Sequence, residues 1–280
     1  MKKISVDLIT ETIKEMCQEA NFDLCHDIET ALVTFKEKEV SPVGEAILGD
    51  ILKNAEIAKE NRVPMCQDTG MAVVFVELGQ EVYIEGGLLE AAINEGIRQG
   101  YSEGFLRKSV VKDPVDRVNT KDNTPGIIHY DIVEGDTLKI TVAPKGFGSE
   151  NMSRMKMLKP SDGIDGVRDF VVETVSLAGP NPCPPIVVGV GIGGTIEKAA
   201  LIAKKSLMRD LDSSHEAEHI KNLEIELLEL INNLGIGPQG LGGLTTALGV
   251  NVEIYPTHIA GLPVVVNINC HAARHVTREL

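Results

Sequence analysis

The order of helical and strand patterns along this chain predicts a mixed α/β fold. The first sixty residues carry apolar side chains at helical spacing, and later apolar runs of strand length alternate with helical segments. One pair of runs also flanks a short turn that contains glycine. We therefore expect one α/β (mixed α+β) domain with a mixed sheet over residues 1–280, in which residues 1–60 form a helical lead-in.

Capping residues and apolar spacing predict the three helices of the lead-in. Ser5 can cap the first helix. Its apolar positions recur every three or four residues, at Ile9, Ile13, Met16, Cys17 and Ala20. Cys17 is therefore expected in the core. A second helix is expected at 27–35, and a third begins at Ser41 and Pro42 and ends before Pro64.

The remaining elements follow from the same patterns. Strands are expected at 71–78, 186–190, 250–254 and 263–268, and a hairpin at 127–133 and 137–143 around Glu134-Gly135-Asp136. Helices are expected at 86–99, 164–177, 196–208 and 216–234, the first with Leu88, Leu89, Ala92 and Ile97 facing inward. Five glycines between Gly235 and Gly243 predict left-handed backbone angles or a close approach of the backbone to a neighbour.

Composition excludes several classes of protein. A chain of 280 residues with 43% hydrophobic residues can bury a core. Five cysteines are too few, and odd in number, for a disulfide framework, so we expect a reducing, cytoplasmic environment. No apolar run suits a signal peptide or a membrane span. A formal charge of −14 argues against nucleic-acid partners, and an anionic substrate would need a local positive site.

Three cysteines lie in separate segments rich in Pro, Gly, Asn and Asp, namely Cys66, Cys183 and Cys270. A closed structural site uses four protein ligands, whereas a catalytic metal centre keeps one position open. Three thiolates therefore favour an iron–sulfur cluster with one exposed iron. The alternative is that each cysteine is an ordinary small core residue. Cys25 has no companion motif and is expected to be structural.

A glycine motif offers a competing interpretation. Gly189-Val190-Gly191-Ile192-Gly193-Gly194 matches G-x-G-x-x-G between a predicted strand and a predicted helix, as in dinucleotide-binding folds. The full fingerprint also needs an acidic residue at the end of a second strand. Asp210 and Asp212 lie between two predicted helices instead. We therefore favour a tight strand-to-helix turn, and nicotinamide binding stays as an alternative.

Motifs along almost the whole chain resemble class I fumarate hydratases, in particular the alpha subunit of the two-subunit form. L-tartrate dehydratase and mesaconate-type hydratases are similar to it as well. The motifs that carry the resemblance are Val63 to Gly70, Leu106 to Ser109, Ala143 to Asn151, Gly179 to Pro185, Gly191 to Thr195 and Thr257 to Cys270.

The resemblance implies a [4Fe-4S] cluster held by Cys66, Cys183 and Cys270, whose open iron acts as a Lewis acid in the reversible hydration of fumarate to L-malate. Elimination of water also needs a proton donor and a base within hydrogen-bond reach.

The resemblance also implies roles for further residues. Asp68 is the acid or water-handling residue, unless it only forms an Asx-turn, and Gln67 contacts the substrate. Arg107 is expected to bind a substrate carboxylate through its planar guanidinium. His258 matches the active-site histidine of the family, whereas His271 directly follows Cys270 and is expected only to orient it. The backbone of residues 145–149 is expected to offer N–H groups to the substrate.

Two features depart from the family pattern. Phe147 stands where family members often have glycine. The threonine base and further arginine and lysine contacts of fused relatives come from a region beyond this chain, so the resemblance implies a beta subunit, an α2β2 assembly and little activity for this chain alone. Two other classes stay open: a nicotinamide-dependent oxidoreductase, and a cluster carrier that would need neither Arg107 nor His258.

Overall fold

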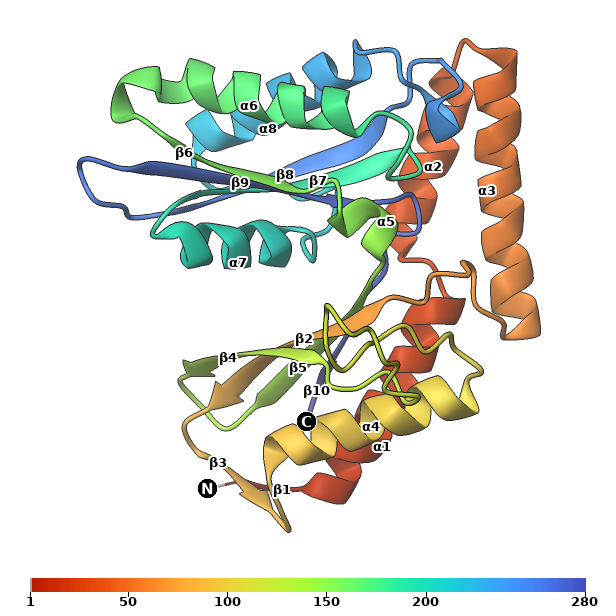
Figure 1. Ribbon diagram of the computed structural model, residues 1–280, viewed down its shortest axis with the longest axis vertical. Helices are drawn as coiled ribbons and strands as arrows, with labels where there is room; N and C mark the ends of the chain where they lie inside the picture. Colours follow the sequence, from red (N-terminus) through yellow and green to blue (C-terminus); the bar gives the residue numbers. More distant parts are fainter. Residues whose placement is uncertain (1) are drawn as a thin grey trace. The chain divides into compact units, whose positions relative to one another are not determined.

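The computed structural model describes residues 2–280, and their helices and strands form two compact units (Figure 1). The first unit contains the residues up to Cys25, Asn54–Phe147 and Arg274–Leu280. The second contains His26–Lys53 and Gly148–Ala273. Each unit has its own hydrophobic core and its own sheet, which contains both parallel and antiparallel strands. Because helices pack on both sheets, the predicted mixed α/β class is confirmed. Across the described residues, no helix is both long and apolar enough to cross a membrane.

The first unit packs two helices against a four-stranded sheet of order β10-β5-β2-β4. Its elements are β1 (Lys2–Ser5), α1 (Val6–Phe22), β2 (Met71–Gly79), β3 (Val82–Glu85), α4 (Leu89–Glu103), β4 (Ile127–Val133), β5 (Leu138–Lys145) and β10 (Val276–Glu279). Strands β1 and β3 pair separately and in parallel.

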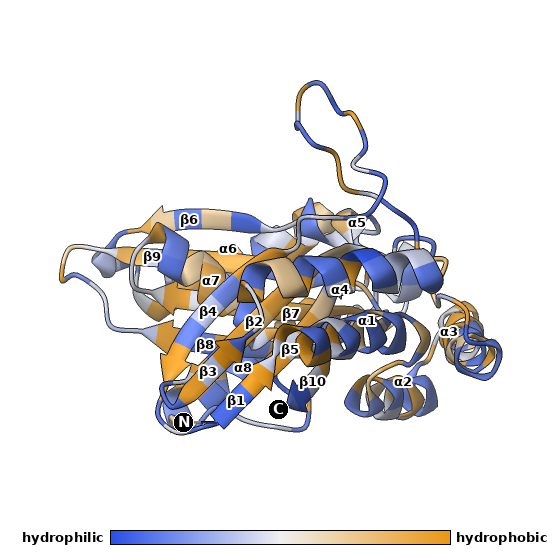
Figure 2. Cartoon of the chain, turned by 90° about the horizontal axis from the view of Figure 1, so that it is seen from below, coloured by the Kyte–Doolittle hydropathy of each residue, from blue (hydrophilic) through white to orange (hydrophobic). Residues whose placement is uncertain are grey.

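Helices α1 and α4 approach each other closely because glycines lie at their contact. A Cβ atom on Gly96 would lie 2.6 Å from the Ile13 side chain, and one on Gly100 would lie 2.8 Å from the Lys14 carbonyl oxygen. Both helices show polar and apolar colours in Figure 2, as expected for elements with one buried face. Ser5 caps α1 as predicted, by accepting the Leu8 N–H at 3.2 Å. Cys17 is completely buried, and burial raises the pKa of its thiol to about 12.

The predicted hairpin at 127–133 and 137–143 is wrong. Strands β4 and β5 do not pair with each other, because β2 lies between them, parallel to β4 and antiparallel to β5. The connection passes over the end of β2, where Gln80 N–H donates to the Val133 carbonyl at 2.9 Å and Gly79 N–H donates to the Thr137 carbonyl at 3.0 Å. The chain does bend at Glu134 to Asp136 as expected, but β2, which is distant in sequence, takes the hydrogen bonds that a hairpin would have used.

The predicted N-terminal helices are confirmed, whereas two details of the first unit differ from the predictions. Helix α2 (His26–Lys38) and helix α3 (Pro42–Asn61) occur where expected. A short strand, β1, precedes α1 and was not predicted. In α4, Ala92 and Ile97 are buried as expected, but Leu88 is 67% exposed because it precedes the first helical turn at the N-cap position.

The second unit is a sheet covered by helices on both faces (Figure 1). Its strands are β6 (Arg154–Leu158), β7 (Ile186–Gly193), β8 (Ala247–Tyr255) and β9 (Leu262–Asn269), in the order β6-β9-β7-β8. Strand β8 is parallel to β7, and β9 is antiparallel to both β7 and β6. Helices α6 (Gly163–Ala178) and α8 (Glu218–Asn232) cover one face, and α7 (Ile196–Ser206) covers the other. Three short helices complete the chain: α5 (Phe147–Glu150), η1 (Pro160–Asp162) and η2 (Pro238–Gly240).

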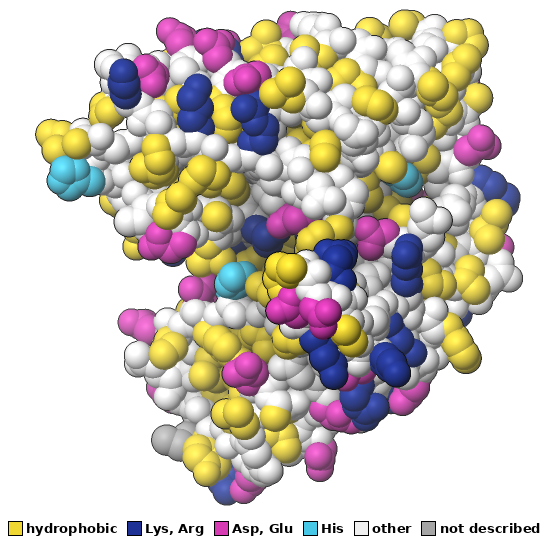
Figure 3. Space-filling model, viewed as in Figure 1, with side chains coloured by type: hydrophobic (Ala, Val, Ile, Leu, Met, Phe, Trp, Pro, Cys, Tyr) yellow, Lys and Arg dark blue, Asp and Glu magenta, His cyan; other side chains and the backbone are white. Residues whose placement is uncertain are grey.

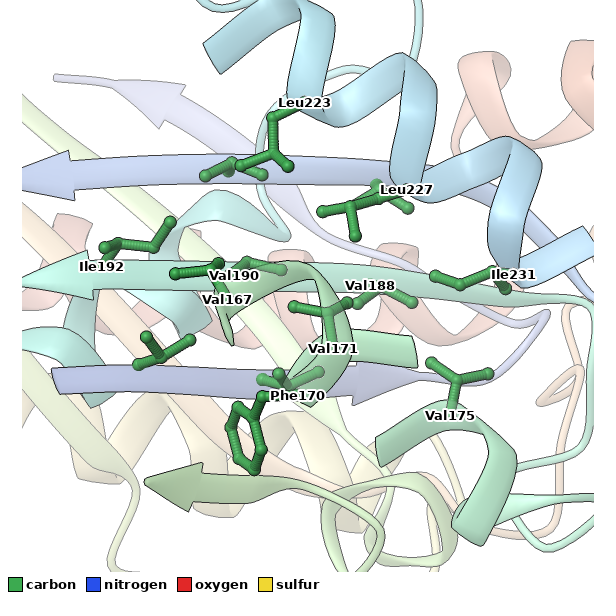
Figure 4. Close-up of a cluster of buried hydrophobic side chains, with 14 of the residues drawn as sticks. Val167, Phe170, Val171, Val175, Val188, Val190, Ile192, Leu223, Leu227 and Ile231 are labelled. Atoms are coloured by element: carbon green, nitrogen blue, oxygen red, sulfur yellow. The ribbon is translucent and has the colours of Figure 1, made fainter. Parts of the chain in front are cut away.

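The core of this unit lies between the sheet and the pair α6 and α8. Figure 4 shows side chains from both helices pointing onto the central strand. Every residue of β7 is buried, as expected for a central strand covered on both faces. On the outer surface, acidic and basic side chains intermingle over α6 and β6 (Figure 3). Arg154, for example, lies 3.3 Å from Glu173 and stacks over the Phe170 ring.

The glycines of the G-x-G-x-x-G motif serve the packing of α7 on β7. Gly189 and Gly191 lie inside the strand. A Cβ atom on Gly189 would lie 2.3 Å from the Ala203 carbonyl oxygen, and one on Gly191 would lie 2.1 Å from the Ala199 carbonyl oxygen, both in α7. Gly193, the last residue of β7, and Gly194 both have positive φ and lead the chain out of the strand toward α7. The close approach of the helix accounts for these glycines, so they do not call for a nicotinamide cofactor.

Candidate active site

The loop that contains Cys66 and Asp68 is held by hydrogen bonds inside the first unit. Asp68 N–H donates to Cys66 Sγ at 3.4 Å. The two carboxylate oxygens of Asp68 accept from backbone groups, Oδ1 from Gly70 N–H at 3.0 Å and Oδ2 from Phe147 N–H at 2.8 Å. The Asx-turn considered from the sequence is therefore present, but the second oxygen reaches further along the chain. These two bonds fix the orientation of the carboxylate.

Buried side chains support this loop from behind. The Tyr101 hydroxyl donates to the carbonyls of Thr69 at 2.7 Å and Gly70 at 3.2 Å, and burial raises the pKa of that hydroxyl. Asn123 is completely buried and donates from Nδ2 to the Gly70 carbonyl at 3.1 Å. Every one of these contacts restrains the same few residues, so the loop is preorganised.

The same network ties Arg107 to the loop. Thr69 Oγ1 donates to the Arg107 carbonyl at 3.0 Å, and Asn123 Oδ1 accepts from Ser109 N–H at 2.7 Å. Arg107 and Gln67 are exposed, and Cys66 is partly exposed. The first unit thus brings Cys66, Gln67, Asp68 and Arg107 into one neighbourhood. The Phe147 N–H, one of the backbone donors expected to face a substrate, is already engaged by Asp68.

Cys183 and Cys270 meet at one end of the sheet in the second unit. Cys183 lies three residues before β7, and Cys270 directly follows β9. The two strands are antiparallel with Val187 opposite Asn269, so the start of one lies beside the end of the other. His271 N–H also donates to the Cys183 carbonyl at 3.4 Å, and this contact joins the two cysteine segments.

The glycine-rich loop at residues 235–243 supports the Cys183 segment. Gln239 donates from its backbone N–H at 2.7 Å and from its side chain at 2.9 Å to the Pro184 carbonyl. A Cβ atom on Gly240 would lie 2.3 Å from the Cβ of Pro180. All five glycines of the loop have positive φ, so both sequence predictions for this loop, left-handed angles and close approach, are confirmed.

Glu39 fastens the end of the same loop. Its carboxylate accepts the N–H groups of Leu244 and Thr245, both at 2.9 Å, and the Thr245 hydroxyl at 2.7 Å. Burial alone would raise the pKa of Glu39, but these hydrogen bonds outweigh it and hold the pKa below its ordinary value. The ionised carboxylate therefore stabilises the folded loop.

His258 lies at the opposite end of the sheet from Cys183 and Cys270. It is exposed and precedes β9, whereas Cys270 follows that strand. The eight residues of β9 span roughly 25 Å at about 3.3 Å per residue. His258 lines an open depression of about 450 Å³ together with Thr195, Lys198 and Tyr255. Within this unit, His258 therefore does not approach the two cysteines.

The cysteines differ in environment in a way that suits metal ligation at three of them. None of the five forms a disulfide bond. Cys183 is exposed, Cys66 and Cys270 are partly exposed, and Cys17 is buried in the core. Cys25 lies 3.7 Å from Nδ1 of His275. No group of three or more His, Cys, Asp or Glu side chains within residues 2–280 is already assembled around a point. The donor set still fits a cluster chemically, because three accessible thiols sit in hydrogen-bonded loops.

Sequence reasoning missed the residues that hold the Cys66 loop. These are Tyr101, Asn123 and Arg274, the last of which donates to the Asp68 carbonyl at 2.5 Å. Asn123 stands in a polar stretch that the sequence leaves without a regular element, and Tyr101 is one of only four tyrosines. The one local hint is the residue type of Asn123, because Asn tolerates the left-handed backbone that this position adopts, with φ of 64°.

The sequence model of the fumarate hydratase (Fumerase) family matches residues 10–279. This chain therefore belongs to that family and is a hydro-lyase. The order of its motifs had pointed to the same family.

Named relatives agree with this assignment. The chain is 44% identical over 278 residues to the "Putative L(+)-tartrate dehydratase subunit alpha" of Methanocaldococcus jannaschii, covering 97% of each chain. It is 34% identical over 280 residues to the L(+)-tartrate dehydratase subunit alpha of Escherichia coli strain UTI89, and 33% identical to that of strain K12. The match to each E. coli protein covers 99% of this chain and 92% of the relative.

Proposed function

We propose that this chain is the alpha subunit of a cytoplasmic iron–sulfur hydro-lyase, with residues 1–280 acting as one catalytic domain. Its cofactor would be a [4Fe-4S] cluster held by Cys66, Cys183 and Cys270. The proposal is supported chiefly by how the structure holds these cysteines. Cys66 lies in a loop fixed by hydrogen bonds, and the Cys183 and Cys270 segments meet at one end of β7 and β9.

The residues beside Cys66 suit the elimination of water from a hydroxy acid. When bound, a cluster with one iron not ligated by cysteine supplies a Lewis acid for the departing hydroxyl. Asp68 holds a carboxylate in one orientation, with lone pairs left to accept or return a proton. Arg107 presents an exposed guanidinium on a segment tied to the same loop, as required to bind a substrate carboxylate. Gln67, also exposed, would contact the substrate.

Two substrates follow from two different observations. The family match favours the reversible hydration of fumarate to L-malate. The names of the relatives favour dehydration of L(+)-tartrate. L-malate and L(+)-tartrate are both four-carbon dicarboxylates that bear a hydroxyl next to a carboxylate. Loss of water from either one needs the same Lewis acid and the same contacts to the carboxylates. Steady-state rates with L-malate and L(+)-tartrate on one preparation decide between them through the ratio of kcat/KM values.

A partner chain is part of the proposal. The relatives are named as alpha subunits, and we propose a beta subunit that supplies a base and further carboxylate contacts in an α2β2 assembly. Purified alone, the chain should show little or no hydro-lyase activity and should gain it when the beta chain is added. Full activity without the partner would contradict this part of the proposal.

The position of His258 gives the second alpha chain a specific role. Because His258 lies at the far end of the sheet from Cys183 and Cys270 in its own chain, we propose that a second copy of the alpha chain provides the histidine of their site. A complementation experiment tests this directly. His258→Asn and Cys66→Ser chains, each inactive alone, are refolded together with the beta chain.

In a two-fold assembly, random mixing gives about half hybrids with one intact site of two, so about a quarter of wild-type activity should return. If His258 acted within its own chain, no hybrid would contain an intact site and activity would not return. Recovery well above background supports the shared site, and complete absence of recovery with confirmed hybrid formation contradicts it.

A further inference from the structure

Arg274 is a buried cation whose hydrogen-bonding capacity is mostly unused. Its side chain is in the first unit and the residue is only 3% exposed. Nη2 donates to the Asp68 carbonyl at 2.5 Å, whereas Nε and Nη1 have no hydrogen-bond partner among the described residues. A guanidinium carries five N–H donors and stays charged at all ordinary pH values, so this arrangement leaves a buried positive charge poorly compensated.

The Asp68 carboxylate does not resolve this imbalance. Both carboxylate oxygens of Asp68 are engaged by backbone N–H groups of Gly70 and Phe147, and Arg274 binds the Asp68 carbonyl instead. The Tyr101 hydroxyl donates to the carbonyls of Thr69 and Gly70, which directly follow Asp68, so Tyr101, Asp68 and Arg274 share one neighbourhood. A buried charge is retained only where an opposite charge or further hydrogen bonds stabilise it.

Asp68 connects this cation to the first cysteine. Its carbonyl accepts from Arg274, and its N–H donates to Cys66 Sγ. A shift of Arg274 would therefore move the backbone that points at the sulfur. We propose that Arg274 is the positioning residue of the Cys66–Gly70 loop and supplies the positive charge for the anionic group that this loop holds. This inference rests on the proposed function, because a cluster bound by three thiolates carries a net negative charge.

The test compares three variants of Arg274 in the complete alpha and beta assembly. Arg274→Lys keeps the charge and loses the planar fork, Arg274→Gln keeps a donor and loses the charge, and Arg274→Met loses both but keeps an unbranched, flexible side chain. The readouts are iron and sulfide per chain, the rate of cluster loss to a chelator, the cluster reduction potential, and the melting temperature of the cluster-free protein. None of these requires catalytic turnover.

The expected results separate charge from packing. Arg274→Gln and Arg274→Met should lose the cluster roughly ten to one hundred times faster than wild type, the range seen when groups that support metal ligands are removed. Their reduction potentials should fall, because a nearby positive charge favours the reduced cluster. Arg274→Lys should restore the potential but only part of the lifetime.

Arg278→Gln is the matched control. Arg278 lies on β10 and pairs with Glu15 and Glu19, remote from the Cys66 loop, so its loss should leave cluster lifetime and potential unchanged. Wild-type lifetime and potential in the Gln and Met variants would overturn the role of Arg274 while leaving the proposed function intact. A wild-type assembly that never binds a cluster would overturn the proposed function itself. If Gln and Met do not fold, a Lys variant with an unchanged lifetime would overturn the inference.

Discussion

Two glycines of the loop at residues 235–243 provide a matched pair for measuring how tightly the Cys183 segment is held. Gly235 and Gly240 have similar φ angles, 66° and 77°. A Cβ atom on Gly235 would meet nothing within 4 Å, whereas one on Gly240 would lie 2.3 Å from the Pro180 Cβ. Substitution by alanine therefore imposes the same left-handed strain at both positions and a collision at only one.

The magnitudes follow from these distances. Left-handed backbone costs an alanine about 1–2 kcal/mol, and this term is shared by the two variants. Overpacking of a close contact adds about 1–3 kcal/mol, and this term applies to Gly240→Ala alone. At about 2–4 °C per kcal/mol for chains of 150–250 residues, Gly240→Ala should melt several degrees below Gly235→Ala.

Urea unfolding of the cluster-free protein measures both free energies, and alkylation of Cys183 reports whether its segment has moved. We expect a larger loss of stability and a changed alkylation rate in Gly240→Ala only. Equal losses of stability in the two variants would refute the close approach of Gly240 to Pro180, and with it the support that the loop gives to Cys183.

Three further predictions concern stability and thiol reactivity. Glu39→Gln should lower the free energy of unfolding by roughly 1–2 kcal/mol at pH 7. Because the folded-state pKa of Glu39 lies below its usual 4.5, the difference between the two proteins should be constant above about pH 5.5 and shrink as the pH falls through the folded-state pKa. Urea unfolding at a series of pH values measures this difference. Asn123→Ala should lower the free energy of unfolding by roughly 3–4 kcal/mol, because three hydrogen bonds of this buried side chain are lost. The same substitution at the exposed Asn61 should lower it by less than about 1 kcal/mol. Similar melting temperatures for the two variants would contradict the network around Asn123. In mass-mapped alkylation of the cluster-free protein at pH 8, Cys183 should react while Cys17, with its pKa near 12, stays unmodified, and rapid labelling of Cys17 in folded protein would disprove its burial.

The sequence predicted the elements better than their pairing. Apolar periodicity and capping located α1, α2 and α3, because these signals are local to each helix. The hairpin between β4 and β5 failed because β2, some fifty residues earlier in the chain, takes the place between them. Pairing depends on competition between distant strands, and no local turn motif encodes it.

In the candidate site, too, the sequence revealed local features but not long-range contacts. Polar, glycine-rich contexts singled out Cys66, Cys183 and Cys270 and left Cys17 to the core. The pattern could not show that β9 separates His258 from Cys270, since that depends on which way the strand runs in the sheet. Nor could it find Arg274, whose contact with Asp68 joins residues 206 positions apart.

The central claim is that three particular cysteines hold an iron–sulfur cluster. Iron and acid-labile sulfide per alpha chain, measured after anaerobic reconstitution in wild type and in Cys66→Ser, Cys183→Ser and Cys270→Ser, test it most directly. Cys25→Ser serves as the control. We predict about four of each per wild-type chain and in the control, and a marked loss in all three ligand variants. A wild-type chain without a cluster, or a cluster content indifferent to those three substitutions, would contradict the account.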